Sequence, residues 1–101
     1  MSELRPTIIE SDAPGLTYQQ TYYRVLEAVL RRRTLIGGQL EDARAHTCAV
    51  GAYFKESRIP IDIRAIDEIA AYNDSFPKLS EQQRWRRVRN WLRFRIKQLK
   101  K

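Results

Sequence analysis

The sequence predicts an all-α fold, in which an irregular arm over residues 1–16 precedes one compact domain of four helices over residues 17–101. Three observations support this prediction. The length of 101 residues suits a single domain. Apolar residues recur at steps of three and four, and no segment shows the alternation of a strand. Prolines, glycines and capping residues separate the periodic segments, and no internal repeat is present.

The first predicted helix begins at the N-cap Thr17 and extends to about Ile36. The arm before it contains two prolines and the run IESDAPG, which favours irregular structure. Gly37 and Gly38 are expected to end the helix by adopting positive φ values, which places the three arginines 31–33 in its last turns. Apolar side chains gather on one face of this helix: Tyr18, Tyr22, Val25, Leu26, Val29 and Leu30.

Two shorter helices are predicted in the middle of the chain. The stretch TCAVGAYFKES is expected to form one of them, with Thr47 as its cap. Pro60 limits this segment, because a proline disfavours helical geometry at the residue before it. Asp62 then caps a third helix that Pro77 closes. The inward-facing residues of this helix are predicted to be Ile63, Ile66, Ile69, Ala70 and Phe76.

The last helix is predicted to begin after Ser80, because Gln83 three residues later completes a capping box. Its core-facing side is an apolar stripe at steps of three and four: Trp85, Val88, Leu92, Ile96 and Leu99. We expect the first and last helices to pack along their apolar faces. The predicted core of the domain is Tyr22, Val25, Leu26, Val29, Ile66, Ala70, Trp85, Val88, Leu92 and Ile96.

The positive charge of the chain is concentrated in this last helix. Residues 80–101 contain nine cations and one acid, a balance of +8, whereas residues 1–79 contain ten cations and eleven acids, a balance of −1. Five cations form a row beside the apolar stripe, here called the basic row: Arg86, Arg89, Arg93, Lys97 and Lys100. Trp91 and Phe94 lie on the opposite flank near Arg87. This pattern predicts a small basic protein that contacts nucleic-acid phosphates. The two aromatic residues could stack on bases, although aromatic residues in such positions are more often buried under another element.

The basic row also permits other interpretations. The same arginines, with Trp91 as an anchor, suit an inhibitor or adaptor that docks onto an acidic or nucleic-acid-binding host complex. The row could equally be the solvated back of a core helix, and the flank of Trp91 and Phe94 could be a homodimer face. Membrane attachment is not expected, because no apolar run approaches the roughly 20 residues that cross a bilayer. The single cysteine and a start without an apolar signal region favour a cytoplasmic location.

Catalytic chemistry has little support in the sequence. The one histidine and the one cysteine, His46 and Cys48, are two residues apart, and a thiol hydrolase would need them to act together. Residues at that spacing usually point away from each other, and one of each falls short of a tetrahedral metal site. We therefore expect no enzymatic activity, no cofactor and no metal site.

Three polar or small residues call for a structural explanation. Gly51 lies inside the predicted second helix, where a glycine costs about 1 kcal/mol relative to alanine, and it predicts a close helix–helix approach. Asn73 and Asp74 end the third helix, and they are expected to cap carbonyl groups or to bind the loop before the second helix.

Three short motifs between residues 46 and 96 include these positions: Cys48-Ala49-Val50-Gly51-Ala52, Asn73-Asp74-Ser75, and Val88 with Trp91-Leu92. With these motifs the chain resembles a family of small uncharacterised phage and bacterial proteins. The resemblance implies a phage or mobile-element setting, in which small proteins often bind host machinery, as inhibitors of CRISPR complexes do. It implies no activity and assigns no catalytic residue.

Overall fold

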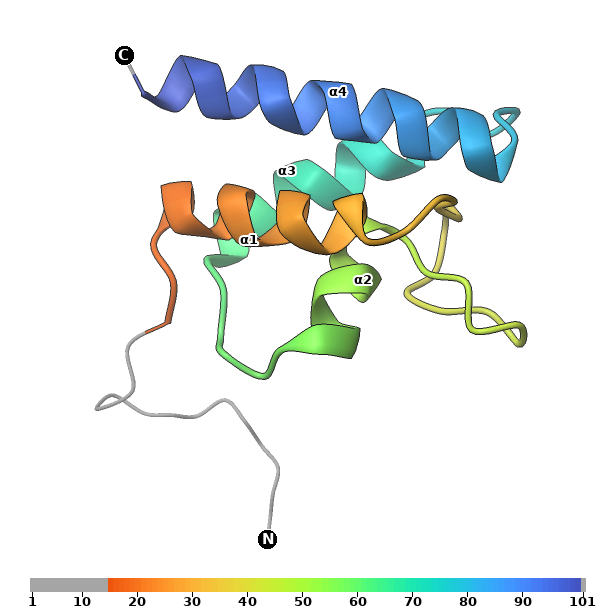
Figure 1. Ribbon diagram of the computed structural model, residues 1–101, viewed down its shortest axis with the longest axis horizontal. Helices are drawn as coiled ribbons and strands as arrows, with labels where there is room; N and C mark the ends of the chain where they lie inside the picture. The colour runs from red at the N-terminus through yellow and green to blue at the C-terminus, as the bar shows by residue number, and fades with distance from the viewer. Residues whose placement is uncertain (1–14, 101) are drawn as a thin grey trace, which may run out of the picture.

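The computed structural model describes residues 15–100 of the chain. It contains four helices: α1 (Tyr18–Leu30), α2 (Ala49–Glu56), α3 (Ile63–Asp74) and α4 (Glu81–Leu99) (Figure 1). Within the described residues the only β pairing is an isolated bridge between Glu41 and Thr47. The all-α, four-helix prediction is thus confirmed. The predicted arm falls largely on residues 1–14, which lie outside the described residues, as does Lys101.

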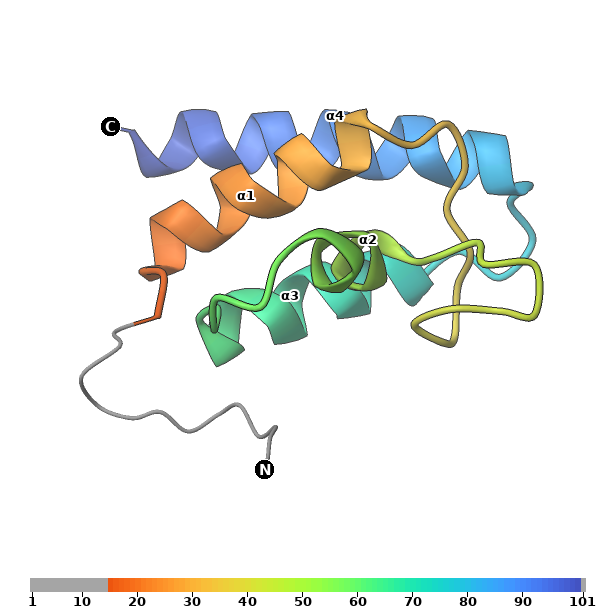
Figure 2. The ribbon, with the colours of Figure 1, turned by 60° about the horizontal axis from the view of Figure 1, so that its bottom comes forward.

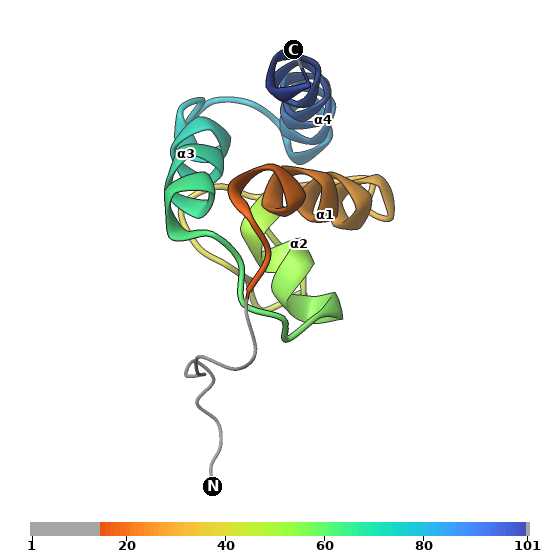
Figure 3. The same cartoon turned by 90° about the vertical axis from the view of Figure 1, so that its left-hand side faces the viewer.

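Helix α1 is the centre of the domain and contacts all three other helices. Figure 2 shows α1 and α4 next to each other above α2 and α3, and the end-on view in Figure 3 shows α1 between α4 and α2. α1 and α4 run antiparallel, since Arg95 near the end of α4 meets Tyr22, whereas Trp85 near its start meets Val29. Six predicted core residues are buried: Tyr22, Val25, Val29, Val88, Leu92 and Ile96. The other four, Leu26, Ile66, Ala70 and Trp85, are partly buried and pack against them.

Most of the helix starts follow the predicted local signals. Thr17 and Ser80 each form a capping box with the glutamine three residues later. Asp62 accepts hydrogen bonds from two N–H groups in the first turn of α3. The predicted cap of α2 is wrong by one residue, because Cys48 and not Thr47 is its N-cap. Thr47 is buried in extended backbone whose carbonyl accepts from the N–H of Ile36 at 3.0 Å, so the helix begins after it.

The predicted end of the first helix at Ile36 is also wrong, since α1 ends at Leu30. Leu35 and Ile36 continue the apolar pattern, but they are buried as parts of a loop. The N–H of Leu35 donates to the carbonyl of Glu81 at 3.0 Å. A carbonyl of α4 thus accepts the hydrogen bond that a carbonyl of α1 would have accepted if α1 were longer. Arginines 31–33 consequently lie beyond the helix. Of the two glycines, Gly38 adopts a positive φ of 82° within the loop and Gly37 does not.

The inward face of α3 agrees with the predicted one at Ile69, Ile66 and Ala70, but not at Ile63. Its buried residues are Ala65, Ile69 and Asn73, whereas Ile63 is 65% exposed and Phe76, beyond the helix, is partly buried. The polar Asn73 can be buried because its amide is fully used: Oδ1 accepts from the N–H of Ala49 at 3.2 Å, and Nδ2 donates to the carbonyl of Ile36 at 2.8 Å.

Contacts of Asp74 and Gly51 complete the attachment of the loop before α2. The Asp74 carboxylate accepts from the N–H of Gly38 at 2.9 Å, which confirms that Asn73 and Asp74 bind this loop. A Cβ at Gly51 would lie 2.2 Å from the carbonyl oxygen of Leu40. The absence of a side chain at Gly51 therefore allows the loop to approach α2 closely. The predicted close approach of a second helix at this position is wrong.

No helix within residues 15–100 has both the length and the apolar content that crossing a bilayer requires.

Candidate nucleic-acid interface

Helix α4 is fixed against the domain by its apolar stripe. Val88, Leu92 and Ile96 are buried against the other helices. At its first turns, Trp85 Nε1 donates at 2.8 Å to the carbonyl oxygen of Val29, which also accepts from the N–H of Arg32 at the end of α1. The side chains on the outer surface of α4 are therefore carried by a helix with a fixed position.

The basic row lies on this outer surface. Four of its members are exposed and Arg89 is partly exposed, with its guanidinium 4.7 Å from the centre of the Trp85 ring. At a rise of 1.5 Å per residue, the 14 steps from Arg86 to Lys100 span about 21 Å. Among residues 15–100, no carboxylate forms an ion pair with any of the five cations. The row is thus a stripe of positive charge that the described acids do not neutralise.

Arg84 belongs to the interior, although the sequence counts it with the cations of α4. Only 5% of this residue is exposed, and its guanidinium donates to the carbonyl oxygens of Asn73 and Phe76, the latter at 2.7 Å. Arg84 is four residues before Val88, so helical spacing places it beside the apolar stripe. This spacing is the feature of the sequence that indicates its burial.

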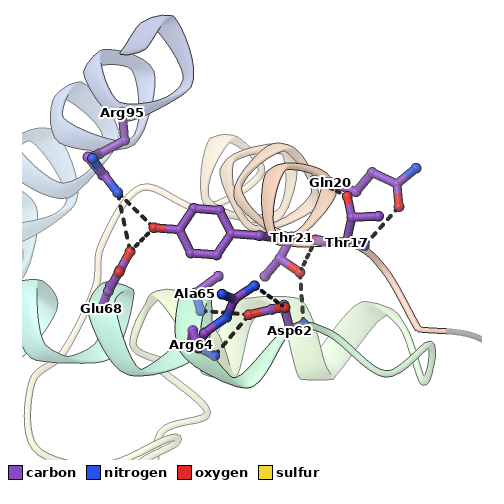
Figure 4. Close-up of polar contacts among 9 residues, drawn as sticks. Thr17, Gln20, Thr21, Asp62, Arg64, Ala65, Glu68 and Arg95 are labelled. Carbon is purple, nitrogen blue, oxygen red and sulfur yellow. Dashed lines mark hydrogen bonds and ion pairs between the residues drawn. The ribbon is translucent and has the colours of Figure 1, made fainter. Parts of the chain in front are cut away.

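Arg95 is likewise occupied within the fold. It donates to the hydroxyl of Tyr18 at 2.8 Å and lies 3.3 Å from the carboxylate of Glu68. Figure 4 shows Arg95 of α4 and Glu68 of α3 pointing toward each other. Hydrogen bonds from Tyr18 and Tyr22 hold the pKa of the Glu68 carboxyl below its ordinary value, and the charge of Arg95 acts in the same direction. Burial, with the hydrogen bond to Glu68, raises the pKa of the Tyr22 phenol. This cluster fixes α4 relative to α1 and α3.

A hollow of about 550 Å³, here called the α3–α4 groove, lies beside the basic row. Tyr72 of α3 and Leu79 of the connection line one side of it. The α4 side is lined by Gln83, Arg86, Arg87, Asn90, Trp91 and Phe94. None of these lining residues is acidic, so the groove combines aromatic, amide and cationic groups without a carboxylate. Arg86 belongs to both the groove and the basic row.

The two aromatic residues of α4 have different surroundings. The ring of Trp91 lies parallel to that of Tyr72, with centroids 4.3 Å apart, and 5.8 Å from the ring of Tyr22. Phe94 is 57% exposed. Trp91 therefore forms part of the groove wall, whereas Phe94 presents an accessible ring. Arg87 is exposed and lies over the ring of Phe76 at 4.8 Å.

Four lining residues were missed by the sequence-based prediction. Gln83 and Asn90 share a helical flank with Arg87 and Phe94, at steps of four, three and four, so this flank could have been found from the sequence. Tyr72 and Leu79 could not, because their place depends on how α3 packs against α4.

The pair His46 and Cys48 does not form a thiol site. The Cys48 sulfur is buried and accepts from the N–H of Gly51 at 3.3 Å, and burial raises the pKa of this thiol. His46 Nδ1 instead lies 2.7 Å from the carboxylate of Glu81. The two side chains thus have separate partners, and neither activates the other.

Asp42, His46 and Glu81 bring potential metal ligands within 4.8 Å of one another. Arg44 occupies the two carboxylates, at 3.2 Å from Asp42 and 2.5 Å from Glu81. The other oxygen of Asp42 accepts from the backbone N–H groups of Arg44 and His46. This cluster has the bonding of an ion-pair network that joins the loop to the start of α4.

Comparisons of the chain with protein-family models, with curated proteins and with solved structures give no match. The resemblance to small phage and bacterial proteins therefore stays a prediction. The basic row and the adjoining α3–α4 groove are the features from which a function can be inferred.

Proposed function

We propose that this protein binds nucleic acid through the basic row, with the sugar–phosphate backbone lying along α4. The observation that carries the proposal is the row itself: five cations over about 21 Å, without an acidic partner among residues 15–100. Three of the five are arginines, whose guanidinium groups can donate two hydrogen bonds to one phosphate. A like-charged row of this kind repels itself in the free protein, and phosphates relieve that repulsion.

The proposal describes a binding protein that acts without a cofactor and not an enzyme. A phage or mobile-element origin and a cytoplasmic location belong to the same proposal. The first is supported by the short motifs around Cys48, Asn73 and Trp91, and the second by the single cysteine.

Phosphate binding predicts a defined salt dependence. Each neutralised phosphate contributes about −0.9 to the slope of log affinity against log salt on a duplex and about −0.7 on a single strand. Five contacts therefore predict a slope of about −4.5 on a duplex and about −3.5 on a single strand. Fluorescence anisotropy with labelled oligonucleotides at several salt concentrations measures this slope.

A double substitution tests the row directly. Arg93→Gln with Lys97→Gln removes two exposed cations and should flatten the duplex slope by about 2, with equal weakening on all sequences. The matched control is Arg24→Gln with Arg58→Gln, which removes the same charge from α1 and from the segment after α2. The control should leave the slope unchanged. Equal effects of the two variants, or binding that is insensitive to salt, would contradict the proposal.

A protein partner is the second candidate, and the exposed ring of Phe94 next to Arg86 and Arg87 favours it. Aromatic and arginine side chains are typical anchors of protein interfaces. In this case the chain is an inhibitor or adaptor that docks onto an acidic surface of a host complex, or onto a second copy of itself. Binding that survives nuclease treatment and is lost in Phe94→Ala, without any affinity for oligonucleotides, would favour this candidate.

A further inference from the structure

We infer that the α3–α4 groove holds an unpaired nucleobase, so that the ligand is single-stranded nucleic acid and not a duplex. This inference rests on the proposed function, because the basic row has to hold the phosphates on either side of that base. The groove is distinct from the row, since it adds aromatic and amide groups. Arg86 belongs to both, so the flank that was predicted to lie opposite the row adjoins it.

The polar groups of the groove suit the edge of a base. The side-chain oxygen of Gln83 already accepts from the N–H of Ser80 at 3.0 Å, and that of Asn90 accepts from Arg89 at 3.1 Å. Their NH₂ groups have no hydrogen-bond acceptor among the described residues. The groove therefore offers two amide donors, and base carbonyls and ring nitrogens are acceptors that match them. An aliphatic side chain of a peptide would cover these donors without bonding them, which is costly.

The shape and charge of the groove support the same ligand. Its volume of about 550 Å³ lies within the range of about 300–1,000 Å³ that small-molecule sites usually have, which is room for one nucleotide. Tyr72 and Trp91 stack on each other and form a fixed wall, while the exposed ring of Phe94 is free to stack on a base. The lining includes Arg86 and Arg87 and no acid, so an anionic ligand is favoured.

One strand can reach both surfaces. Arg86 lies in the groove and in the basic row, and Arg93 of the row directly precedes Phe94 of the groove. A nucleic-acid backbone that follows the row therefore contacts Arg86, which also lines the groove, and Arg93, which is next to Phe94 in the sequence of the same helix. In a duplex each base is paired and stacked, so none can enter the groove without being extruded.

The inference is tested with three labelled probes of equal length: oligothymidylate, an abasic phosphodiester chain with the same charge, and a duplex. At one salt concentration the oligothymidylate should bind about 5- to 150-fold more tightly than the abasic chain, because one stacked base contributes about 1–3 kcal/mol. Phe94→Ala should reduce the affinity for oligothymidylate to that for the abasic chain without altering the salt slope. Phe54→Ala, which removes a phenylalanine of α2 that is 48% exposed, is the matched control and should have no effect.

The outcomes separate this inference from the proposed function. Equal binding of oligothymidylate and the abasic chain, with a steep salt slope, would overturn the groove as a base site and leave the basic row in place. Tighter binding of the duplex than of the oligothymidylate, with no change in Phe94→Ala, would likewise overturn the groove as a base site and leave the basic row in place. If none of the probes binds, both proposals fail. An acidic peptide that binds wild type but not Phe94→Ala would then assign the groove to a protein partner. Circular dichroism of each variant confirms that it is folded.

Discussion

Arg84 and Arg86 stand two residues apart in α4, and we expect alanine at these two positions to have very different effects on stability. Arg84 donates to two main-chain carbonyls at the end of α3 and packs against Gly37. A hydrogen bond from a charged group contributes about 1.5–3 kcal/mol. Two such bonds are partly offset by the cost of burying the guanidinium, so we expect Arg84→Ala to lower the free energy of unfolding by about 2–4 kcal/mol. Arg86→Ala should change it by less than about 0.5 kcal/mol, since Arg86 is exposed.

Urea denaturation followed by far-UV circular dichroism measures both changes. Small domains have unfolding free energies of about 5–15 kcal/mol, so Arg84→Ala should remain folded without urea. Arg84→Lys is the control for charge, and we expect an intermediate loss because a single ammonium group cannot reproduce the planar fork of arginine. The reasoning would be refuted if Arg84→Ala were as stable as wild type, or if Arg86→Ala lost as much stability as Arg84→Ala.

Two further predictions concern the core and the polar cluster. Leu92→Ala should cost about 2–5 kcal/mol in urea denaturation because this side chain is fully buried, while the salt slope of nucleic-acid binding should stay unchanged because the basic row is intact. Glu68→Gln should lessen the loss of stability in acid. The folded-state pKa of Glu68 is lowered, so its stabilising effect is present above the ordinary glutamate pKa of about 4.3 and is lost as the pH falls through the lower folded value. The carboxylate is partly exposed, so the difference between wild type and Glu68→Gln should be about 1 kcal/mol or less, and a difference that stays the same from neutral pH to acid would contradict the assignment.

The features that were predicted correctly are those that local interactions determine. The caps at Thr17, Asp62 and Ser80 depend on residues within one turn, and the apolar stripe of α4 depends on spacing alone. The end of α1 was mispredicted because Leu35 and Ile36 are apolar for a reason outside the helix. Both are buried in a loop, where the N–H of Leu35 bonds to Glu81 of α4 and the N–H of Ile36 bonds to Thr47. Similarly, Ile63 is apolar and was predicted to face inward, but the way α3 packs leaves it exposed to solvent.

Only those parts of the candidate site that consist of α4 residues could be predicted from the sequence. The basic row follows from helical spacing, as does the flank with Arg87 and Phe94. The sequence does not show that Arg84 and Arg95 are used inside the fold, because their partners are main-chain carbonyls, tyrosines and a glutamate on other elements. Nor does it show that Tyr72 covers Trp91, since their contact depends on the angle between α3 and α4.

Helix α4 is synthesised after the other three helices, yet it supplies partners to segments that leave the ribosome much earlier. Trp85 bonds Val29 across 56 positions, and Arg95 bonds Tyr22 across 73. Until α4 emerges, the face of α1 that it covers stays open to water, and the loop near Leu35 lacks the carbonyl that binds it. We therefore expect the nascent chain to complete its fold only once α4 has cleared the exit tunnel, and to fold more slowly than a bundle built from neighbouring helices, because contacts distant in sequence form slowly. During that interval the open face of α1 is available to chaperones.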